Sequence, residues 1–293
     1  MHKIKKAKTK VSPEPPAGRR VITPAPHEPE HVCADRLSPQ ETLRVWPARL
    51  QAALAEQRIR AAYQPIVTLS DAAVVAEEAL ARFIATDGAV TPAGVFIEAA
   101  TACDLVAAID EAVLNQTLTR CTDRRAQGLP GRLHFVNIAK ALLVAPGRLA
   151  HLATAVETCG TPWPQDDPRW RSLVLEITER ELITDLPRMM SALAPLLDAG
   201  VRLALDDFGS GYSSFLYLAD LRITFLKIEQ ALIARVGQDR RVDIMVGALA
   251  RMAADLNIIT IAEGIESAIT AESVARLGVV WGQGYHFGRP GWE

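Results

Sequence analysis

The stretch Arg202-Leu203-Ala204-Leu205-Asp206-Asp207-Phe208-Gly209 decides how the fold of this sequence is interpreted. An apolar, strand-like run ends on two adjacent carboxylates and continues into a glycine-rich turn. Neighbouring anions repel each other, and their desolvation is costly unless a cation compensates, so a bound divalent metal ion is one explanation. The alternative is a surface turn in which an aspartate caps the following helix. Other strands that end in the same way would favour the metal site.

Seven further strand-like runs occur along the chain, separated for the most part by amphipathic stretches. With Arg202–Phe208, the predicted strands are Ala62–Val67, Val74–Arg82, His134–Ile138, Leu173–Thr178, Phe225–Ile228, Ile258–Ala262 and Val279–Gly284. Helical spacing of apolar residues appears in Ala107–Gln127, Arg188–Ala199, Val242–Asn257 and Ile269–Leu277.

The connections between these runs indicate how the strands pair. The Thr68–Ala72 connection is too short for a crossover helix, so the first two strands are expected to be antiparallel. The rest alternates strand and helix, which favours a parallel sheet. We therefore expect an α/β fold, a modified TIM (β/α)8 barrel with an antiparallel first strand pair. A doubly wound open sheet is the alternative.

The N-terminal segment differs in composition from the remainder. Lysines are frequent before residue 11, and six of the 18 prolines fall between Pro13 and Pro29, so residues 1–37 are expected to form a disordered, basic and proline-rich tail. Ser38-Pro39-Gln40-Glu41 has the pattern of a capping box at a helix start. Pro47 is expected to break this helix, with a second segment from Ala48 to Gln57. Residues 38–293 are expected to form one domain.

Composition excludes some classes of protein. With 49% hydrophobic residues, 23% charged residues and a net charge of −2, the chain predicts a globular protein that binds no nucleic acid polymer. The most apolar stretch, around residues 244–261, is interrupted by Arg251 and Asp255, so no membrane span is expected. The four cysteines lack metal or disulfide spacing, which favours reduced thiols and a cytoplasmic location.

Polar side chains recur at the carboxyl ends of the predicted strands, and those ends meet on one face of such a barrel. They are Glu78, Asn137, Glu176, Asp206 with Asp207, Lys227, Glu263 and Gln283, with Gln64 and Arg82 flanking the first two strands. Each alone has a simpler explanation, such as a surface ion pair, a turn residue or a solvated lysine. Because nearly every strand repeats the pattern, we expect a functional site.

At these residues the chain resembles the EAL family of cyclic di-GMP phosphodiesterases, from about Leu50 to Pro290. Eight motifs carry the resemblance: Tyr63-Gln64-Pro65-Ile66-Val67, Glu78-Ala79-Leu80-Ala81-Arg82-Phe83, Val136-Asn137-Ile138, Glu176-Ile177-Thr178-Glu179, Asp206-Asp207-Phe208-Gly209-Ser210-Gly211-Tyr212-Ser213-Ser214, Leu226-Lys227-Ile228, Ala262-Glu263-Gly264-Ile265-Glu266 and Gln283-Gly284-Tyr285-His286-Phe287-Gly288-Arg289-Pro290.

The resemblance implies a modified TIM barrel that hydrolyses cyclic di-GMP to linear pGpG with Mg2+ or Mn2+ at a two-metal site. By motif position, the metal ligands are Glu78, Asn137, Glu176, Asp206 and Asp207. Oxygen ligands of this kind suit hard cations. Lys227 is expected to orient the attacking water, and Glu263 matches the family's proposed general base. Substrate contacts are expected from Gln64, Arg82 and Gln283.

Two further glutamates, Glu179 and Glu266, match family positions that hold the Asp-Phe-Gly loop; for both, a surface salt bridge is the alternative. The resemblance also suggests a homodimer packed near that loop. A catalytically silent module that binds cyclic di-GMP or a partner protein is the second functional hypothesis. An unrelated metal-dependent barrel enzyme is the third, which the matches at Gln64, Arg82 and Gln283 argue against.

Overall fold

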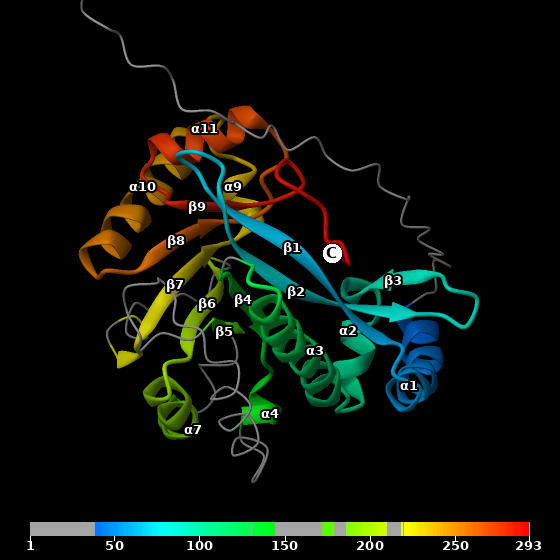
Figure 1. The fold of residues 1–293 in the computed structure, drawn as a ribbon. Helices are drawn as coiled ribbons and strands as arrows, with labels where there is room; N and C mark the ends of the chain where they lie inside the picture. The colour runs from blue at the N-terminus through cyan, green and yellow to red at the C-terminus, as the bar shows by residue number, and fades with distance from the viewer. Residues whose placement is uncertain are drawn as a thin grey trace, which may run out of the picture.

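Eight β-strands close into a barrel in the computed structural model, which describes residues 39–129, 131–143, 172–178, 186–209, 218 and 220–292 (Figure 1). The barrel strands are β1 (Ile59–Thr68), β2 (Val74–Ile84), β4 (Leu133–Asn137), β5 (Leu173–Thr178), β6 (Arg202–Phe208), β7 (Ile223–Ile228), β8 (Ile259–Ala262) and β9 (Trp281–Gln283). A short strand, β3 (Val90–Pro92), extends the sheet beyond β2.

The pairing confirms the predicted barrel. β1 is antiparallel to both β2 and β9, with Gln64 opposite Glu78 and Ile66 opposite Gln283. The pairs from β2 through β4 and on to β9 are all parallel. Because β1 hydrogen-bonds to neighbours on both sides, the sheet has no open edge at that position, which excludes the doubly wound alternative. The eight predicted strands correspond to the eight barrel strands.

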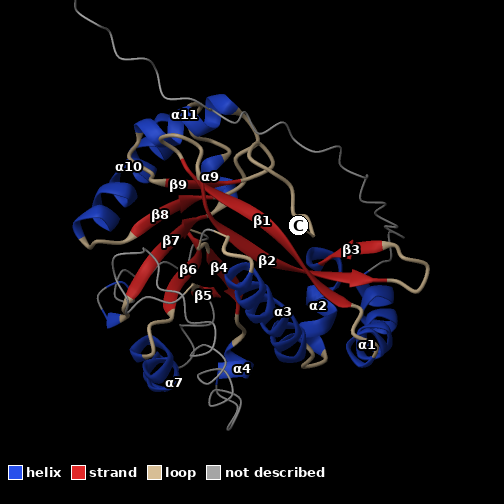
Figure 2. Ribbon diagram, viewed as in Figure 1, coloured by secondary structure: helices blue, strands red, loops and turns tan. Residues whose placement is uncertain are grey.

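Helices surround the barrel on the outside (Figure 2). They are α1 (Pro39–Ala55), α2 (Ala93–Ala102), α3 (Val106–Ala126), α4 (Lys140–Leu143), α7 (Leu186–Asp198), α9 (Gln230–Ile233), α10 (Arg240–Asp255) and α11 (Ala268–Arg276). The four helices predicted from apolar spacing are α3, α7, α10 and α11. Four elements were not predicted: β3, α2, α4 and α9. Three or four residues are too few to show a period in β3, α4 and α9, and the ten alanine-rich residues of α2 give a weak one.

The prediction that Pro47 breaks the first helix is wrong, because α1 continues through it to Ala55. Proline removes one helical hydrogen bond, at a cost of about 3 kcal/mol. Burial of Trp46 and Leu50 on either side of Pro47 offsets that cost. The Trp46 ring packs edge-on against Phe83 of β2, with a centroid separation of 5.1 Å. Tertiary packing therefore overrides the local signal. The predicted tail, residues 1–37, lies outside the described residues.

Candidate active site

Two layers of side chains fill the barrel. The lower layer is apolar and fully or nearly buried, and it consists of Ile66, Ala76, Phe135, Val174, Ala204, Phe225, Ile261 and Trp281, together with Leu133 below Phe135. Side chains two positions apart on a strand point to the same face. On every barrel strand the residue two positions from this layer is polar, namely Gln64, Glu78, Asn137, Glu176, Asp206, Lys227, Glu263 and Gln283. The predicted site residues therefore form a polar layer on an apolar floor.

Lys227 lies at the centre of the polar layer. Its side chain is 1% exposed, and Nζ is 2.8 Å from Glu263 Oε1 and 2.9 Å from Glu176 Oε1. The same atom is 3.3 Å from Glu78 Oε2 and 3.3 Å from Asp206 Oδ1. Four carboxylates from four strands thus share one ammonium, and the solvated-lysine alternative for Lys227 is excluded.

The shared ammonium leaves the layer with excess negative charge, and the pKa values respond to it. Burial opposes the charged form of Lys227, but Asp206, Glu176, Glu263 and Glu78 together hold its pKa well above the usual value. Burial and the nearby charge of Glu78 raise the pKa of Glu176 well above that of an ordinary glutamate. A carboxyl group that favours its proton in this way indicates unmet demand for positive charge.

Amide side chains hold the remaining carboxylate oxygens. Asn137 Nδ2 donates to Glu78 Oε1 (3.1 Å) and to Glu176 Oε2 (3.2 Å). Gln283 Nε2 donates to Glu78 Oε2 (2.6 Å) and to Gln64 Oε1 (3.2 Å), and Gln64 Nε2 donates to the carbonyl of Gly288 (3.0 Å). Gln64 and Gln283 are therefore joined to the carboxylate layer by hydrogen bonds, and the turn-residue alternative for Gln283 is excluded.

A β-bulge in β6 brings Asp207 to the rim. From Leu205 to Phe208 the strand advances three residues while β7 advances two, from Leu226 to Ile228. Consecutive strand residues normally point to opposite faces, so Asp207 would point away from Asp206 in a regular strand. At the bulge, Asp207 instead adopts φ 56°, in the left-handed region that aspartate tolerates better than most residues. One oxygen each from Asp206, Asp207 and Glu263 then lie within 4.8 Å of one another. The surface-turn alternative thus does not describe Asp206, which is buried in the layer.

The remaining predicted residues lie apart from this group or outside the described residues. Arg82 is buried on β2, four residues beyond Glu78, so its Cα lies about 13 Å along the strand from that of Glu78. Glu266 is exposed just after β8. Glu179 lies outside the described residues. The predicted substrate and loop-holding roles of these three residues stay predictions.

The oxygen donors fit a hard divalent cation. Carboxylates from Glu78, Glu176, Asp206, Asp207 and Glu263 are the donor type that Mg2+ and Mn2+ prefer. Glu176 Oε1 is fully buried, and the Lys227 ammonium 2.9 Å away is its charged neighbour. A second positive centre would satisfy this oxygen and balance the excess of carboxylates.

A supporting cluster that the sequence analysis missed lies behind Glu78, on the outer face of β2. Glu77 accepts from Arg120 Nε of α3 and lies 3.1 Å from His134 Nδ1 and 3.5 Å from Arg132 Nη1. Although burial raises the pKa of Glu77, hydrogen bonds from His134 and Arg120 lower it to about 2. The signal available in the sequence was the charged pair Glu77-Glu78 within a buried strand, since such neighbours face opposite sides.

Gly284 allows the backbone after Gln283 to pass close to Ile265. A Cβ atom on Gly284 would lie 2.2 Å from Ile265 O and 2.3 Å from Ile265 N, which backbone atoms cannot tolerate. We expect Gly284→Ala to lower the free energy of unfolding by about 2 kcal/mol or more and to displace Gln283. Urea denaturation of the variant measures this. An unchanged midpoint would contradict it, and Gly291→Ala, where a Cβ meets nothing within 4 Å, is the matched control.

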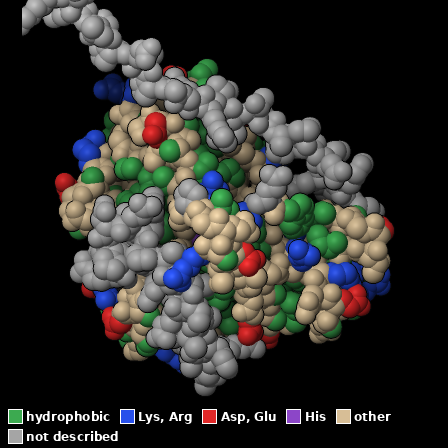
Figure 3. Space-filling model, in the orientation of Figure 1, with side chains coloured by type: hydrophobic (Ala, Val, Ile, Leu, Met, Phe, Trp, Pro, Cys, Tyr) green, Lys and Arg blue, Asp and Glu red, His purple; other side chains and the backbone are tan. Residues whose placement is uncertain are grey.

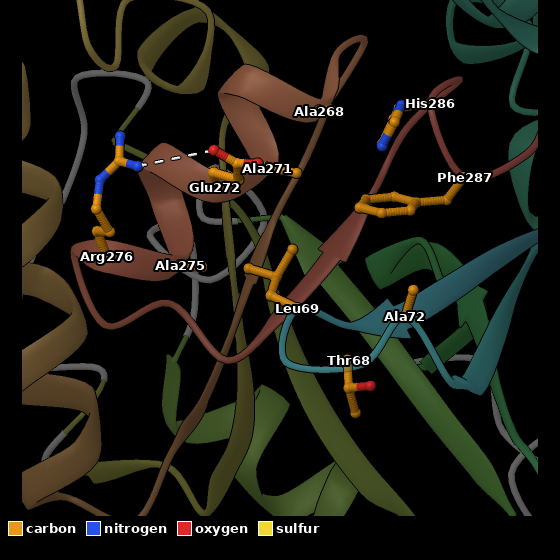
Figure 4. A pocket seen from close by; sticks show the side chains of 10 residues that line it. All are labelled: Thr68, Leu69, Ala72, Ala268, Ala271, Glu272, Ala275, Arg276, His286 and Phe287. Atoms are coloured by element: carbon orange, nitrogen blue, oxygen red, sulfur yellow. Dashed lines mark ion pairs between the residues drawn. The ribbon is translucent and has the colours of Figure 1, made fainter.

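An apolar hollow of about 360 Å³ lies on the outside of the barrel, between α11 and the β1–β2 turn (Figure 4). Leu69, Ala271, Ala275 and Phe287 contribute apolar lining, and Glu272 and Arg276 form an ion pair at its edge. The hollow contains none of the polar layer residues, so its shape does not identify the site of chemistry.

The face of the molecule shown in Figure 3 carries charges of both signs. On the face shown in Figure 3, basic and acidic side chains of the described residues are interspersed rather than gathered by sign. Within the described residues, no helix combines the length and apolarity needed to cross a bilayer.

The chain forms a TIM-like barrel in which β1 is antiparallel to its neighbours, and carboxylates gather at one rim of the barrel. Its sequence shows to which family of such barrels it belongs. Residues 48–290 match the model of the EAL domain, and the chain therefore belongs to the EAL domain family. Among curated relatives, the probable cyclic di-GMP phosphodiesterase PdeG of Escherichia coli K12 is 30% identical over 229 residues, which are 78% of this chain and 44% of PdeG.

A further curated relative and two solved structures are also similar to this chain. The bifunctional diguanylate cyclase/cyclic di-GMP phosphodiesterase MucR of Pseudomonas aeruginosa is 32% identical over 242 residues, covering 82% of this chain and 34% of MucR. The solved structure of the PaMucR phosphodiesterase with c-di-GMP superposes with TM-score 0.74 at 28% identity, covering 83% of this chain and 96% of that one. The solved structure of the EAL enzyme Bd1971, bound to cAMP and cyclic di-GMP, superposes with a TM-score of 0.75 at 25% identity, covering 86% of this chain and 66% of that one. This chain spans less than half the length of PdeG and MucR.

Proposed function

We propose that this protein hydrolyses one phosphodiester bond of cyclic di-GMP and releases linear pGpG, with Mg2+ or Mn2+ as cofactor. The observation that carries the proposal is the buried layer in which Glu78, Glu176, Asp206 and Glu263 surround Lys227. The EAL relatives named as cyclic di-GMP phosphodiesterases, and the PaMucR phosphodiesterase in complex with c-di-GMP, support the choice of substrate.

Two divalent cations would be held by Glu78, Asn137, Glu176, Asp206 and Asp207, and when bound they would activate water and neutralise charge on the phosphate. Water attacks phosphorus and the bond from phosphorus to the 3′ oxygen breaks. The 3′ oxygen takes up a proton from solvent and becomes a hydroxyl, and the attacking oxygen stays on the 5′ phosphate of pGpG. Glu263 accepts the proton that the water loses, and Lys227, 2.8 Å from it, orients the water. The surrounding carboxylates raise the pKa of Lys227 and so keep it positively charged.

The substrate itself is held by Arg82, further along β2, and by two amide side chains of the polar layer. Arg82 presents a guanidinium that can bind a phosphate through two hydrogen bonds. Gln64 and Gln283 offer amide groups that can pair with a guanine edge or a phosphate oxygen. Burial of Arg82 and both glutamines favours one fixed orientation for each side chain.

A paired measurement of turnover and binding tests the proposal against the silent-module alternative. Purified protein is incubated with cyclic di-GMP and Mn2+, products are separated by chromatography, and binding is measured by calorimetry with Ca2+ in place of Mn2+. We expect pGpG to accumulate with Mn2+ and to disappear when a chelator is added. Binding without product at any Mn2+ or Mg2+ concentration would overturn the catalytic proposal and favour a cyclic di-GMP-binding module.

We further propose a cytoplasmic homodimer, as the family resemblance suggests. If assembly near the Asp-Phe-Gly loop supports the metal rim, specific activity rises with protein concentration through the dimer dissociation constant. Light scattering at the same concentrations reports the oligomeric state. Equal specific activity for monomer and dimer would count against this coupling.

A further inference from the structure

Asp110 is a buried carboxylate that the proposed chemistry does not use. It lies on α3, which packs against the outside of β2 and β4, and its exposed fraction is only 8%. Its neighbours on the helix, Ile109, Val113 and Leu114, are buried apolar residues. A carboxylate in such surroundings is costly unless it accepts hydrogen bonds. Asp110 Oδ2 accepts one from the backbone amide of Ala139, at 2.7 Å.

The hydrogen bond from Ala139 anchors the segment that follows β4. The pairing of β2 with β4 ends one residue before Asn137. On the side of β5, the amide of Ile138 donates to the carbonyl of Glu176 (3.0 Å). The next amide, that of Ala139, donates to Asp110, and α4 follows directly as a helix of only four residues. Because so short a helix adds little stability of its own, α3 supplies the second anchor of this segment.

Asn137 depends on this anchor because it lies two residues before Ala139. Its Nδ2 donates to Glu78 Oε1 (3.1 Å) and to Glu176 Oε2 (3.2 Å), and both distances are already at the upper end of the usual range. A backbone shift of about 0.5 Å would break at least one of these hydrogen bonds. The position of the backbone after β4 therefore decides whether one amide can bridge the two carboxylates.

We propose that Asp110 is a positioning residue, which holds the backbone after β4 so that the Asn137 amide bridges Glu78 and Glu176. Its effect on turnover rests on the proposed function, whereas the anchoring of Asn137 does not. The polar layer already has an excess of carboxylates, so a further negative charge outside the barrel does not help it. Asp110 acts as a hydrogen-bond acceptor, and the carbonyl of an asparagine can take its place.

Kinetics of the whole protein with Mn2+ and cyclic di-GMP test the effect on turnover. We expect Asp110→Ala to lower kcat about 10–100-fold and to change KM by no more than about threefold, because the proposed substrate contacts lie elsewhere. Asp110→Asn should keep kcat within about threefold of wild type, because it restores the acceptor. Gln116→Ala is the matched control, since Gln116 of the same helix accepts from the backbone amide of Ala61 on β1 (3.1 Å). Its kcat should stay at the wild-type value.

A measurement without substrate separates the anchor from the proposed function. NMR of the whole protein follows hydrogen exchange at the Ala139 amide and the resonance of the Asn137 side-chain amide. Asp110→Ala should speed this exchange at least about tenfold and shift this resonance. Asp110→Asn and Gln116→Ala should leave both unchanged. If Asp110→Ala does not fold, Asp110→Leu takes its place, because leucine fills the same volume without an acceptor.

Unchanged exchange and an unchanged Asn137 resonance in Asp110→Ala would overturn the proposal. A wild-type kcat in Asp110→Ala, or a loss in Asp110→Asn as large as in Asp110→Ala, would overturn it as well. If neither apolar variant folds, Asp110→Asn decides, because a loss of kcat of about tenfold or more there contradicts the acceptor role. The expected NMR changes in a protein that forms no pGpG would refute the proposed function and leave the anchoring of Asn137 standing.

Discussion

Replacement of Glu78 by glutamine should lower kcat for cyclic di-GMP by about 10³-fold or more while the barrel stays folded. Glu78 contacts Lys227, Asn137 and Gln283 from one buried carboxylate. Glutamine fills the same volume but removes the charge that a cation would bind. Burial opposes the charge of Glu78, but Lys227 and the amide of Gln283 hold its pKa below the usual value, so loss of this charge should lower the free energy of unfolding by about 1–2 kcal/mol.

Initial rates of pGpG formation and urea denaturation of the same preparation check both parts. Glu77→Gln is a close control, because Glu77 is the next residue on β2 and faces the outside of the barrel. It should retain most of the turnover. Near-normal kcat for Glu78→Gln would contradict the assignment of Glu78 as a metal ligand.

The same Glu77→Gln variant carries the largest expected effect on stability, a loss of about 3 kcal/mol in the free energy of unfolding. The carboxylate of Glu77 is almost fully buried and lies among Arg120, Arg132 and His134. Without its charge, the neighbouring arginines keep their charges and lose their common partner. Arg120 also stacks over the Tyr63 ring at 4.1 Å, so the cluster joins α3 to β1 and β2.

The pH dependence gives this prediction its sign. The pKa of Glu77 falls from 4.5 to about 2 on folding, so its charge stabilises the fold in full above about pH 4.5, and that contribution is lost as pH falls toward 2. The difference in unfolding free energy between wild type and Glu77→Gln should therefore shrink below about pH 4.5. Urea denaturation at pH 7 and pH 4 measures it. A constant difference would show that shape, rather than charge, accounts for the loss.

Much of the barrel could be predicted from the sequence because its strands are short, apolar and separated by periodic helices. The short connection after Thr68 predicted the antiparallel pair, and β1 indeed closes the barrel between β2 and β9. Local signals failed where packing overrides them. Pro47 lies within α1 because buried Trp46 and Leu50 hold the helix against Phe83 and its neighbours.

The residues of the polar layer could be predicted from the sequence, but their positions relative to one another could not. They stand two positions from apolar strand residues, a regular spacing that the printed sequence contains. The bulge at Asp207 could not be predicted from the sequence, because it depends on a one-residue shift in the pairing of β6 with β7. The central position of Lys227 was equally hidden, since four separate strands create it. Glu77 was overlooked because its partners are distant in sequence.

Hydrolysis in water enriched in oxygen-18 tests the central claim most directly. Wild-type protein is incubated with Mn2+ and unlabelled cyclic di-GMP, and the masses of the isolated pGpG and its fragments are measured by mass spectrometry. The proposed attack of water on phosphorus predicts one labelled oxygen per pGpG, located in its terminal phosphate. Absence of pGpG, or pGpG without the label in that phosphate, would contradict the account.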